Sequence, residues 1–395
     1  MTPTPRDRAW LWWCVAAASV LSLYASVPYV REMQVLLRSQ LQDYFDIIFR
    51  ATIALLGAAL LISGVWLELK RARSNRAAAD RQFSVVRLVL KKAAQVAICV
   101  ALYYFGLSEA IATNPAQGVR IIEFVHLFQF TLVTLLVLKA VATSIKGRAS
   151  YIVAFLVMCL VGLGDEAIQG YIARRVGELR DVQINAIVAA LALLAVWLIF
   201  SPRVLSARSA HDHKALVLSL MGLAVIGSAA FILSFHIGYR IEDARCGVFY
   251  SLYPKEELLN RSKNARLGPR LPPGGSLASA RIRGFWAPED FYETEAFRHL
   301  AERDKLERQV RHWEAFCEER IRRIYYAPFA DLGEWAGWTA ERMRKEFGDY
   351  NISHFVSYHY DLVFRGWRRW HVLAVSFAAC TVLLVLGIVS KWQRG

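Results

Sequence analysis

The chain has 395 residues, of which 56% are hydrophobic, and it carries a formal net charge of +15. This apolar content argues against an ordinary soluble globular protein and predicts a polytopic membrane protein. The cations are spread over short loops, whereas a nucleic-acid surface needs them clustered in a stripe, so we predict no nucleic-acid partner.

Apolar segments near the bilayer-spanning length of about 20 residues predict about eight transmembrane helices. They lie at residues 9–28, 47–68, 88–111, 121–143, 151–169, 184–201, 216–238 and 371–390. The first one is not followed by a small-residue cleavage site, which favours a retained helix over a signal peptide. The predicted fold class is an all-α polytopic membrane protein with an α-rich extracytoplasmic domain between its last two helices.

The distribution of Lys and Arg predicts the orientation, because cytoplasmic loops retain these residues. The loop after the second helix holds a dense group of them between Lys70 and Arg87. Counting outward from that loop places both termini in the cytoplasm and residues 239–370 outside. Arg174, Arg175 and Arg180 lie on the outer side, against this trend.

Composition divides the chain into five regions. The predicted regions are an accessory transmembrane hairpin with a basic cytoplasmic loop (1–87), a four-helix membrane core (88–202), a cytoplasmic loop with the seventh span (203–238), an extracytoplasmic soluble domain (239–370), and the eighth span with a short cytoplasmic tail (371–395).

Within residues 239–370, the segment from Phe291 to Tyr326 has the periodicity of one long amphipathic helix. Its predicted apolar face carries Phe297, Leu300, Val310, Trp313, Cys317, Ile321 and Ile324. Its alternating Glu and Arg residues are typical of a solvated salt-bridge surface. A shorter helix is predicted over residues 332–347.

Two further features of this region leave alternatives open. Cys246 and Cys317 are candidates for a disulfide in an oxidising compartment, or they are two unpaired thiols. The aromatic stretch that includes Trp367 and Trp370 is expected at a membrane interface, and the sharper alternative is a platform that stacks carbohydrate.

Polar side chains gather at the predicted outer ends of three membrane helices. Each such group costs about 2.5–3.5 kcal/mol if it faces lipid, so a chain that places several at one depth is expected to use them. Residues three or four apart share a helical face, and this spacing relates Glu123 to His126, Asp165 to Gln169, and Asp181 to Asn185. Glu166 adds a carboxylate beside Asp165.

Arginines follow this cluster in the sequence. The planar fork of Arg174 and Arg175 suits phosphate or carboxylate groups, so the set could hold an anionic headgroup directly or through a metal. The purely structural alternative is that Asp165 pairs with one of these arginines, and that Glu123 pairs with Arg120.

The polar positions resemble the VanZ-like family of multi-spanning membrane proteins. The matching pattern is Glu123-x-x-His126, then Gly162-x-x-Asp165-Glu166-x-x-Gln169, then Arg175, Asp181 and Asn185. The resemblance covers about residues 88–202. The chain departs from the family pattern at Ala173 (Pro in the family), Gln129 (acidic), Phe130 (Tyr), and Val188 and Ala192 (both Gly).

The resemblance implies a multi-pass protein of the bacterial cytoplasmic (inner) membrane, with a role in the cell envelope. The founding member is associated with resistance to the glycopeptide antibiotic teicoplanin, and no reaction comes with the family. A membrane lipid or lipid-linked envelope precursor is the expected ligand, and the outer domain is a candidate for binding a protein partner.

Three functions fit these residues, and we leave open whether the protein is an enzyme. As an enzyme, it would use Asp165 or Glu166 as general base and His126 as proton carrier, with Glu123 in the same catalytic set. The expected substrate contacts are Gln169, Arg174, Arg175, Asp181 and Asn185.

Two alternatives use the same residues without catalysis. A scaffold would hold a lipid without reacting, and a transporter would relay protons through the carboxylates and His126. No cofactor is assigned, although a divalent metal held by His126, Glu123 and Asp165 is compatible with the ligand types.

Overall fold

The computed structural model describes residues 5–29, 44–74, 85–112, 117–171, 177–200, 213–264, 291–330, 345–347, 352–357, 367 and 369–392. The chain divides into two compact units. A bundle unit comprises residues 1–165, 180–225 and 379–395, and a second unit comprises residues 166–179 and 226–378.

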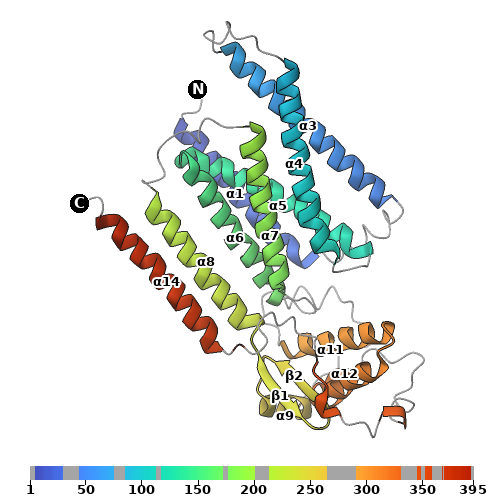
Figure 1. Ribbon diagram of the computed structural model, residues 1–395. Helices are drawn as coiled ribbons and strands as arrows, with labels where there is room; N and C mark the ends of the chain where they lie inside the picture. The colour runs from blue at the N-terminus through green and yellow to red at the C-terminus, as the bar shows by residue number, and fades with distance from the viewer. Residues whose placement is uncertain are drawn as a thin grey trace. The chain divides into compact units, whose positions relative to one another are not determined.

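Long helices account for most of the described chain (Figure 1). They are α1 (Pro5–Ser26), α3 (Phe45–Ser74), α4 (Val85–Ala112), α5 (Gln117–Ser144), α6 (Arg148–Tyr171), α7 (Leu179–Ala195), α8 (Lys214–Phe235) and α14 (Arg369–Trp392). Six of them, all except α3 and α4, contain a described segment long and apolar enough to cross a membrane.

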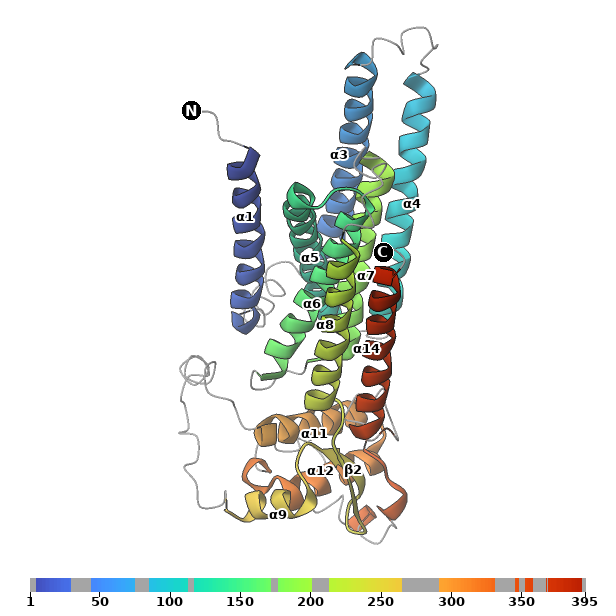
Figure 2. The same ribbon diagram turned by 90° about the vertical axis from the view of Figure 1, so that its left-hand side faces the viewer.

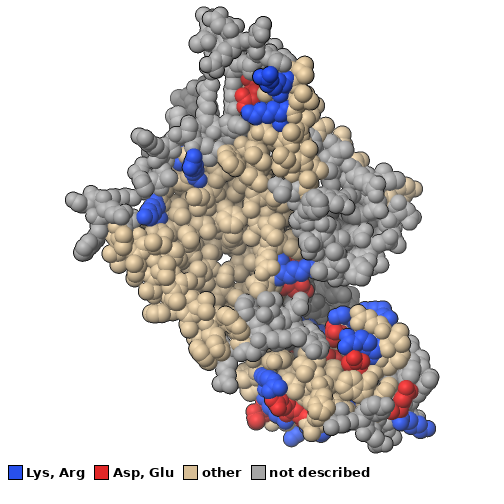
Figure 3. All heavy atoms as spheres, in the orientation of Figure 1, with Lys and Arg blue, Asp and Glu red and all other residues tan. Residues whose placement is uncertain are grey.

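These helices agree with a predominantly α-helical membrane protein. On the face shown in Figure 3, a broad area of the helices carries no described Lys, Arg, Asp or Glu, and the charges gather toward the helix ends. Such a surface suits lipid contact, because an unpaired charge facing the acyl chains is costly. The count of eight spans and the outer position of residues 239–370 stay predictions.

The core of the bundle unit is formed mainly by α1, α5, α6 and α7. Fully buried Phe130, Val141, Ala154, Met158 and Ala189 lie in one apolar cluster, to which α1 contributes Ala16 and Leu23. Helix α1 packs on α5, whereas the sequence favoured an accessory hairpin for the first two spans. The first helix therefore belongs to the same core as α5, α6 and α7.

Helices α3 and α4 run side by side in both ribbon views (Figures 1 and 2) and pack against each other. Both also contact a π-helical turn, η3 (Val196–Phe200), that continues α7. The buried ammonium of Lys92 donates a hydrogen bond to the carbonyl of Ile199 in this turn, and the Glu68 carboxylate lies 3.7 Å away. An ion pair and a carbonyl thus compensate a charge that the apolar helices could not bury alone.

The second unit contains a polar domain, which we define as residues 239–357. Strands β1 (Tyr239–Asp243) and β2 (Gly247–Ser251) form an antiparallel hairpin, and helices α9 (Lys255–Asn264), α11 (Phe291–Arg308) and α12 (His312–Tyr325) complete it (Figure 1). The hairpin is an addition to the α-rich domain expected from the sequence. Its turn is fixed by Asp243, whose carboxylate accepts the Arg245 backbone N–H at 2.9 Å.

A later segment extends the hairpin edge. Val248 N–H donates to the Phe355 carbonyl at 2.8 Å, and Ser357 N–H donates to the Val248 carbonyl at 2.8 Å. The short helices η6 (Ala327–Phe329) and η7 (Ile352–His354) lie before and within this return of the chain. The domain encloses its own apolar core, with Phe249, Leu258, Ile321 and Tyr325 fully buried.

The long helix predicted from Phe291 to Tyr326 is wrong, because the chain breaks into α11 and α12 between Gln309 and Arg311. No glycine or proline marks this break in the sequence. Val310 occupies it with a φ of 61° and is 73% exposed, although the periodicity had placed it on the apolar face. A β-branched residue with positive φ is a clear outlier.

Replacing Val310 with glycine should raise the free energy of unfolding of the polar domain by about 1 kcal/mol, because glycine adopts the left-handed region without a Cβ clash. Hydrogen–deuterium exchange of the full chain in lipid nanodiscs would measure the change in α11 and α12. Gln309→Gly is the matched control and should gain nothing, since Val310 is the non-glycine residue with positive φ among the described residues. An equal gain in both variants would show that Val310 is unstrained.

Cys246 and Cys317 are both fully buried free thiols in the core of the polar domain. Burial raises the pKa of Cys246 to about 12 and also raises the pKa of Cys317. The thiolate is the reactive form, so both groups are expected to be inert in the folded protein.

Iodoacetamide at pH 8 should therefore leave Cys246 and Cys317 unmodified in the folded chain and alkylate both after unfolding. Mass spectrometry of peptides around the two residues would detect the adducts. Resistance to alkylation after unfolding, relieved only by a reductant, would instead show that the two sulfurs form a disulfide.

Candidate functional site

The predicted polar residues lie where α6 ends and α7 begins. Asp165 and Asn185 are each 1% exposed, Glu166 and Gln169 are buried, and Asp181 is half-buried in the first turn of α7. Glu123 and His126 lie in α5, but their side chains are outside the described residues, as are Arg174 and Arg175. The described part of the predicted site is therefore its α6 and α7 portion.

Gly162 brings these two helices into close contact. A Cβ atom at Gly162 would lie 2.9 Å from the Cβ of Asn185, so the absence of a side chain at residue 162 allows Asn185 to approach the backbone of α6. Asp165 follows Gly162 by three residues, and Asp181 precedes Asn185 by four. The step from Gly162 to Asp165 and the step from Asn185 to Asp181 both run toward the ends at which these antiparallel helices are connected. The two carboxylates therefore lie about one helical turn beyond the contact between Gly162 and Asn185.

Asn185 combines deep burial with unused hydrogen-bonding capacity. Neither its Oδ1 nor its Nδ2 has a hydrogen-bond partner in the described structure. Leaving a buried polar group unsatisfied costs about 1–3 kcal/mol, and an apolar side chain of similar size would avoid that cost. The amide is therefore the described group most in need of an additional partner at the α6–α7 contact.

The carboxylate of Glu166 is differently placed, because both its oxygens accept hydrogen bonds. Oε1 accepts from Gln169 Nε2 at 2.7 Å, and Oε2 accepts from the backbone N–H of Glu178 at 3.0 Å. Gly177 lies so close to the Glu166 carbonyl that a Cβ could not be accommodated. These contacts favour a role for Glu166 in holding the segment after α6 rather than in abstracting a proton.

Helix α1 supports the α6 end of the bundle unit. Tyr24 Oη donates to the Val161 carbonyl at 3.1 Å, and a Cβ at Gly164 would lie 2.5 Å from that hydroxyl oxygen. Gln129 of α5 donates to Ser26 Oγ at 3.5 Å. The last turns of α1 therefore contact both α5 and α6. The contacts to α6, at Val161 and Gly164, directly adjoin Gly162 and Asp165 in the sequence.

No set of three or more His, Cys, Asp or Glu side chains within the described ranges is arranged to hold a metal ion. The side chains of Glu123 and His126, two of the predicted metal ligands, are not among those that the structure describes. Asp165 and Asp181 could supply oxygen ligands to a hard cation, and the metal stays a prediction.

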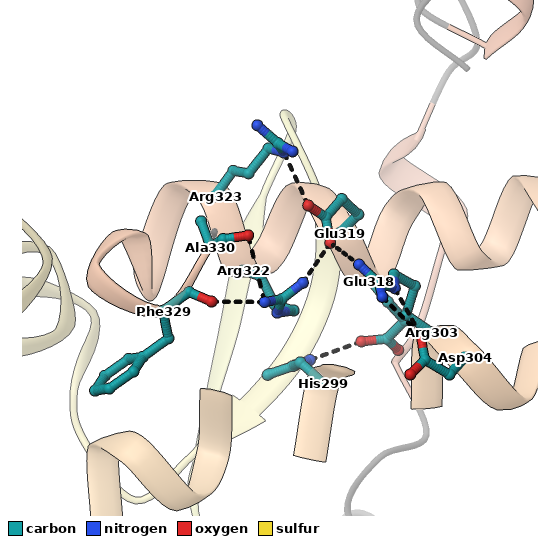
Figure 4. Close-up of polar contacts among 9 residues, drawn as sticks. All are labelled: His299, Arg303, Asp304, Glu318, Glu319, Arg322, Arg323, Phe329 and Ala330. Carbon is teal, nitrogen blue, oxygen red and sulfur yellow. Dashed lines mark hydrogen bonds and ion pairs between the residues drawn. The ribbon is translucent and has the colours of Figure 1, made fainter. Parts of the chain in front are cut away.

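The polar domain contains a buried charge network that the sequence had not indicated. The expected solvated surface of Glu and Arg is wrong for four residues, because Arg303, Glu318, Glu319 and Arg322 are each at most 4% exposed. Figure 4 shows Glu319 between Arg303, Arg322 and Arg323. Its oxygens accept hydrogen bonds from these three arginines at 3.0, 2.6 and 2.9 Å, while Arg322 also donates to the Phe329 carbonyl at 2.6 Å.

A second buried polar cluster, made of His299, Glu318 and Ser357, connects α11, α12 and the segment 352–357. Glu318 Oε2 lies 2.6 Å from His299 Nδ1 (Figure 4), and its Oε1 accepts from Ser357 Oγ at 2.5 Å. Burial raises the pKa of Glu318 to about 8 and holds the pKa of His299 well below its usual value. Both side chains are therefore predominantly uncharged at neutral pH.

One sequence signal could have revealed part of this network. Glu318, Glu319 and Arg322 directly adjoin Cys317 and Ile321, so a wide buried face on α12 must include charged residues. Their partners on α11 could not be assigned, because one continuous helix would have kept the two halves apart.

Comparisons of this chain with protein-family models, with curated proteins and with solved structures give no match.

Proposed function

We propose that the chain is an integral membrane protein of the bacterial cell envelope that binds a lipid-linked anionic substrate where α6 meets α7. Asn185 carries this proposal, because it is a buried amide whose two polar atoms lack partners in the described structure. A ligand that both donates and accepts hydrogen bonds would satisfy it.

The surrounding residues support a ligand that is part lipid and part polar headgroup. Asp165 and Asp181 offer acceptors for hydroxyl or amide groups beside Asn185, or oxygen ligands for a bridging cation. Arg174 and Arg175 follow α6 in the sequence and are suited to phosphate. The apolar helices would hold the lipid chain, while the headgroup would occupy their polar ends.

Binding without catalysis is the form of the proposal that the contacts favour. Glu166, a general-base candidate, accepts two hydrogen bonds that hold the following segment. An envelope scaffold would keep the lipid-linked headgroup in place, and the polar domain, with its own apolar core, would recruit a protein partner. An enzyme would additionally turn over a lipid-phosphate substrate, which separates the two functions.

Asn185→Leu provides a test in which the two expected effects have opposite signs. In ligand-free protein, leucine should increase the thermal stability, because it removes an unsatisfied amide while retaining a similar shape. With a polyprenyl phosphate added to phosphatidylcholine nanodiscs, the wild-type chain should gain stability and the variant should gain much less. Gln183→Leu, on the exposed side of α7, is the control and should retain the response.

Two results would contradict the proposal. A loss of stability in ligand-free Asn185→Leu would show that the fold itself satisfies the amide. An equal response to polyprenyl phosphate in the wild type and in both variants would show that the lipid binds elsewhere.

A further inference from the structure

A cavity of about 140 Å³ lies in the polar domain, partly open to solvent, between α11, α12 and the chain that returns along the hairpin. Its lining includes Glu302, Arg311, Trp313, Glu318 and Phe355. A cavity of this size accommodates about one six-membered ring. None of these residues belongs to the α6–α7 site, so the cavity is independent of the function proposed above.

Aromatic side chains form one wall of the cavity. Trp313 and Phe355 pack edge to face, with ring centroids 5.8 Å apart and an interplanar angle of 89°. The indole Nε1 of Trp313 is buried and has no hydrogen-bond partner within the described chain. Because indole nitrogen is only a donor, the missing partner must present an acceptor, which excludes a simple ammonium group from that position.

The charged residues of the cavity already have partners. Arg311 Nη2 lies 2.9 Å from the Glu314 carboxylate, and Lys305 Nζ lies 3.1 Å from that of Glu302. Glu318 is held by His299 and Ser357, and its raised pKa keeps it largely protonated at neutral pH. The cavity therefore offers many donors and acceptors but little uncompensated charge.

We propose that this cavity binds a single sugar residue, with the ring against Trp313 and Phe355 and the hydroxyl groups on the polar wall. A hydroxyl both donates and accepts hydrogen bonds, so it can accept from the Trp313 N–H and donate to a carboxylate oxygen of Glu302 or Glu314. An aromatic face combined with a few placed polar groups is the usual composition of small-ligand sites. This site is separate from the aromatic stretch around Trp367 and Trp370.

Saturation-transfer NMR on the full chain in phospholipid nanodiscs would test the proposal with glucose and N-acetylglucosamine as probes. Maltoside detergents must be absent, because their headgroups are sugars and would compete. We expect transfer to at least one probe. Trp313→Phe keeps the aromatic wall and removes the N–H, and should weaken binding about fivefold, the loss expected for one hydrogen bond; Trp313→Ala should abolish detectable transfer.

Trp370→Phe is the matched control, since Trp370 is 59% exposed in α14 and should leave transfer unchanged. Loss of transfer in this control but not in the Trp313 variants would overturn the assignment in favour of the interfacial aromatic residues. Absence of transfer to either sugar in the wild type would overturn it outright. Saturation transfer to butylamine alone, abolished by Glu302→Gln, would instead identify a cation site.

Discussion

Replacing Glu319 with glutamine should lower the free energy of unfolding of the polar domain by about 3–5 kcal/mol, the cost of removing one partner from a buried ion pair. Glu319 is 4% exposed and is the carboxylate toward which Arg303 and Arg322, themselves 4% and 1% exposed, both point. Without the negative charge, two neighbouring buried guanidinium groups would face each other. Asp304 compensates Arg303 in part, at 2.7 Å.

Hydrogen–deuterium exchange of the full chain in nanodiscs would measure this effect in peptides covering α11 and α12. Glu257→Gln is the matched control, because it removes an equivalent carboxylate from a solvent-exposed pair with Arg261 on α9. Such pairs contribute about 0–1 kcal/mol. Comparable losses in the two variants would contradict a special role for the buried network.

A double variant, Glu319→Gln with Arg322→Met, separates charge compensation from packing. If the cost of Glu319→Gln arises from uncompensated cations, removing one of them should restore part of the stability. If the double variant loses the sum of the two single losses, the residues act independently. Arg322→Met also removes the hydrogen bond from Arg322 to the Phe329 carbonyl, and this loss limits the stability that the double variant can regain.

The membrane helices were the most predictable part of the fold, because an apolar segment of bilayer length has few alternatives. The packing of α1 on α5 was not predictable in the same way. Contacts between apolar helices depend on side-chain shape, as at Gly164, where the missing side chain makes room for Tyr24. Helix periodicity contains no information about which neighbour provides such a fit.

From the sequence, the α6–α7 site could be predicted as a set of polar residues at the connected ends of two helices. Spacing alone related Asp165 to Gln169 and Asp181 to Asn185, and the helices place both sets where α6 and α7 are connected. The different environments of the neighbouring residues Asp165 and Glu166 were not predictable. Glu166 is defined by its bond to the backbone of Glu178, twelve residues away, and that contact depends on the path of the intervening chain.

In the polar domain, helical periodicity predicted the burial of some residues correctly and of others wrongly. A helical period identified Cys317 and Ile321 as buried, and both are. The same period placed Val310 in the core, whereas the break between α11 and α12 exposes it. Folding α11 back against α12 also buries Glu318 and Glu319, because charges compensated by partners on the other helix can enter a core that excludes single charges.

Between pH 6.5 and 8, the polar domain should lose stability as the pH rises, by at most about 2 kcal/mol. Burial raises the pKa of Glu318 from an ordinary value of 4.5 to about 8. The native carboxyl therefore keeps a proton that the unfolded chain has released, and a native state that binds more protons is destabilised by increasing pH. The hydrogen bond from Ser357 and the charge of Lys305 both lower this pKa, but burial has the larger effect.

The other titratable groups with shifted pKa values do not obscure the effect of Glu318 between pH 6.5 and 8. His299 has a pKa well below its ordinary value of 6.5, so near the lower end of the window it adds a slope of the opposite sign, which disappears as the unfolded imidazole also becomes neutral at higher pH. The thiols of Cys246 and Cys317, with raised pKa values, affect stability mainly above the window. Burial also raises the pKa of Glu295, and any contribution from it has the same sign as that of Glu318.

Glu318→Gln isolates the contribution of Glu318, because glutamine can still accept from Ser357 Oγ and donate to His299 Nδ1 but cannot ionise. The variant should keep the stability of the wild type near pH 6.5 and lose less of it by pH 8. Glu256→Gln, at an exposed position on α9, should retain the wild-type slope. Hydrogen–deuterium exchange corrected for the intrinsic pH dependence would give each slope, and identical slopes for wild type and Glu318→Gln would show that Glu318 is already ionised in the native protein.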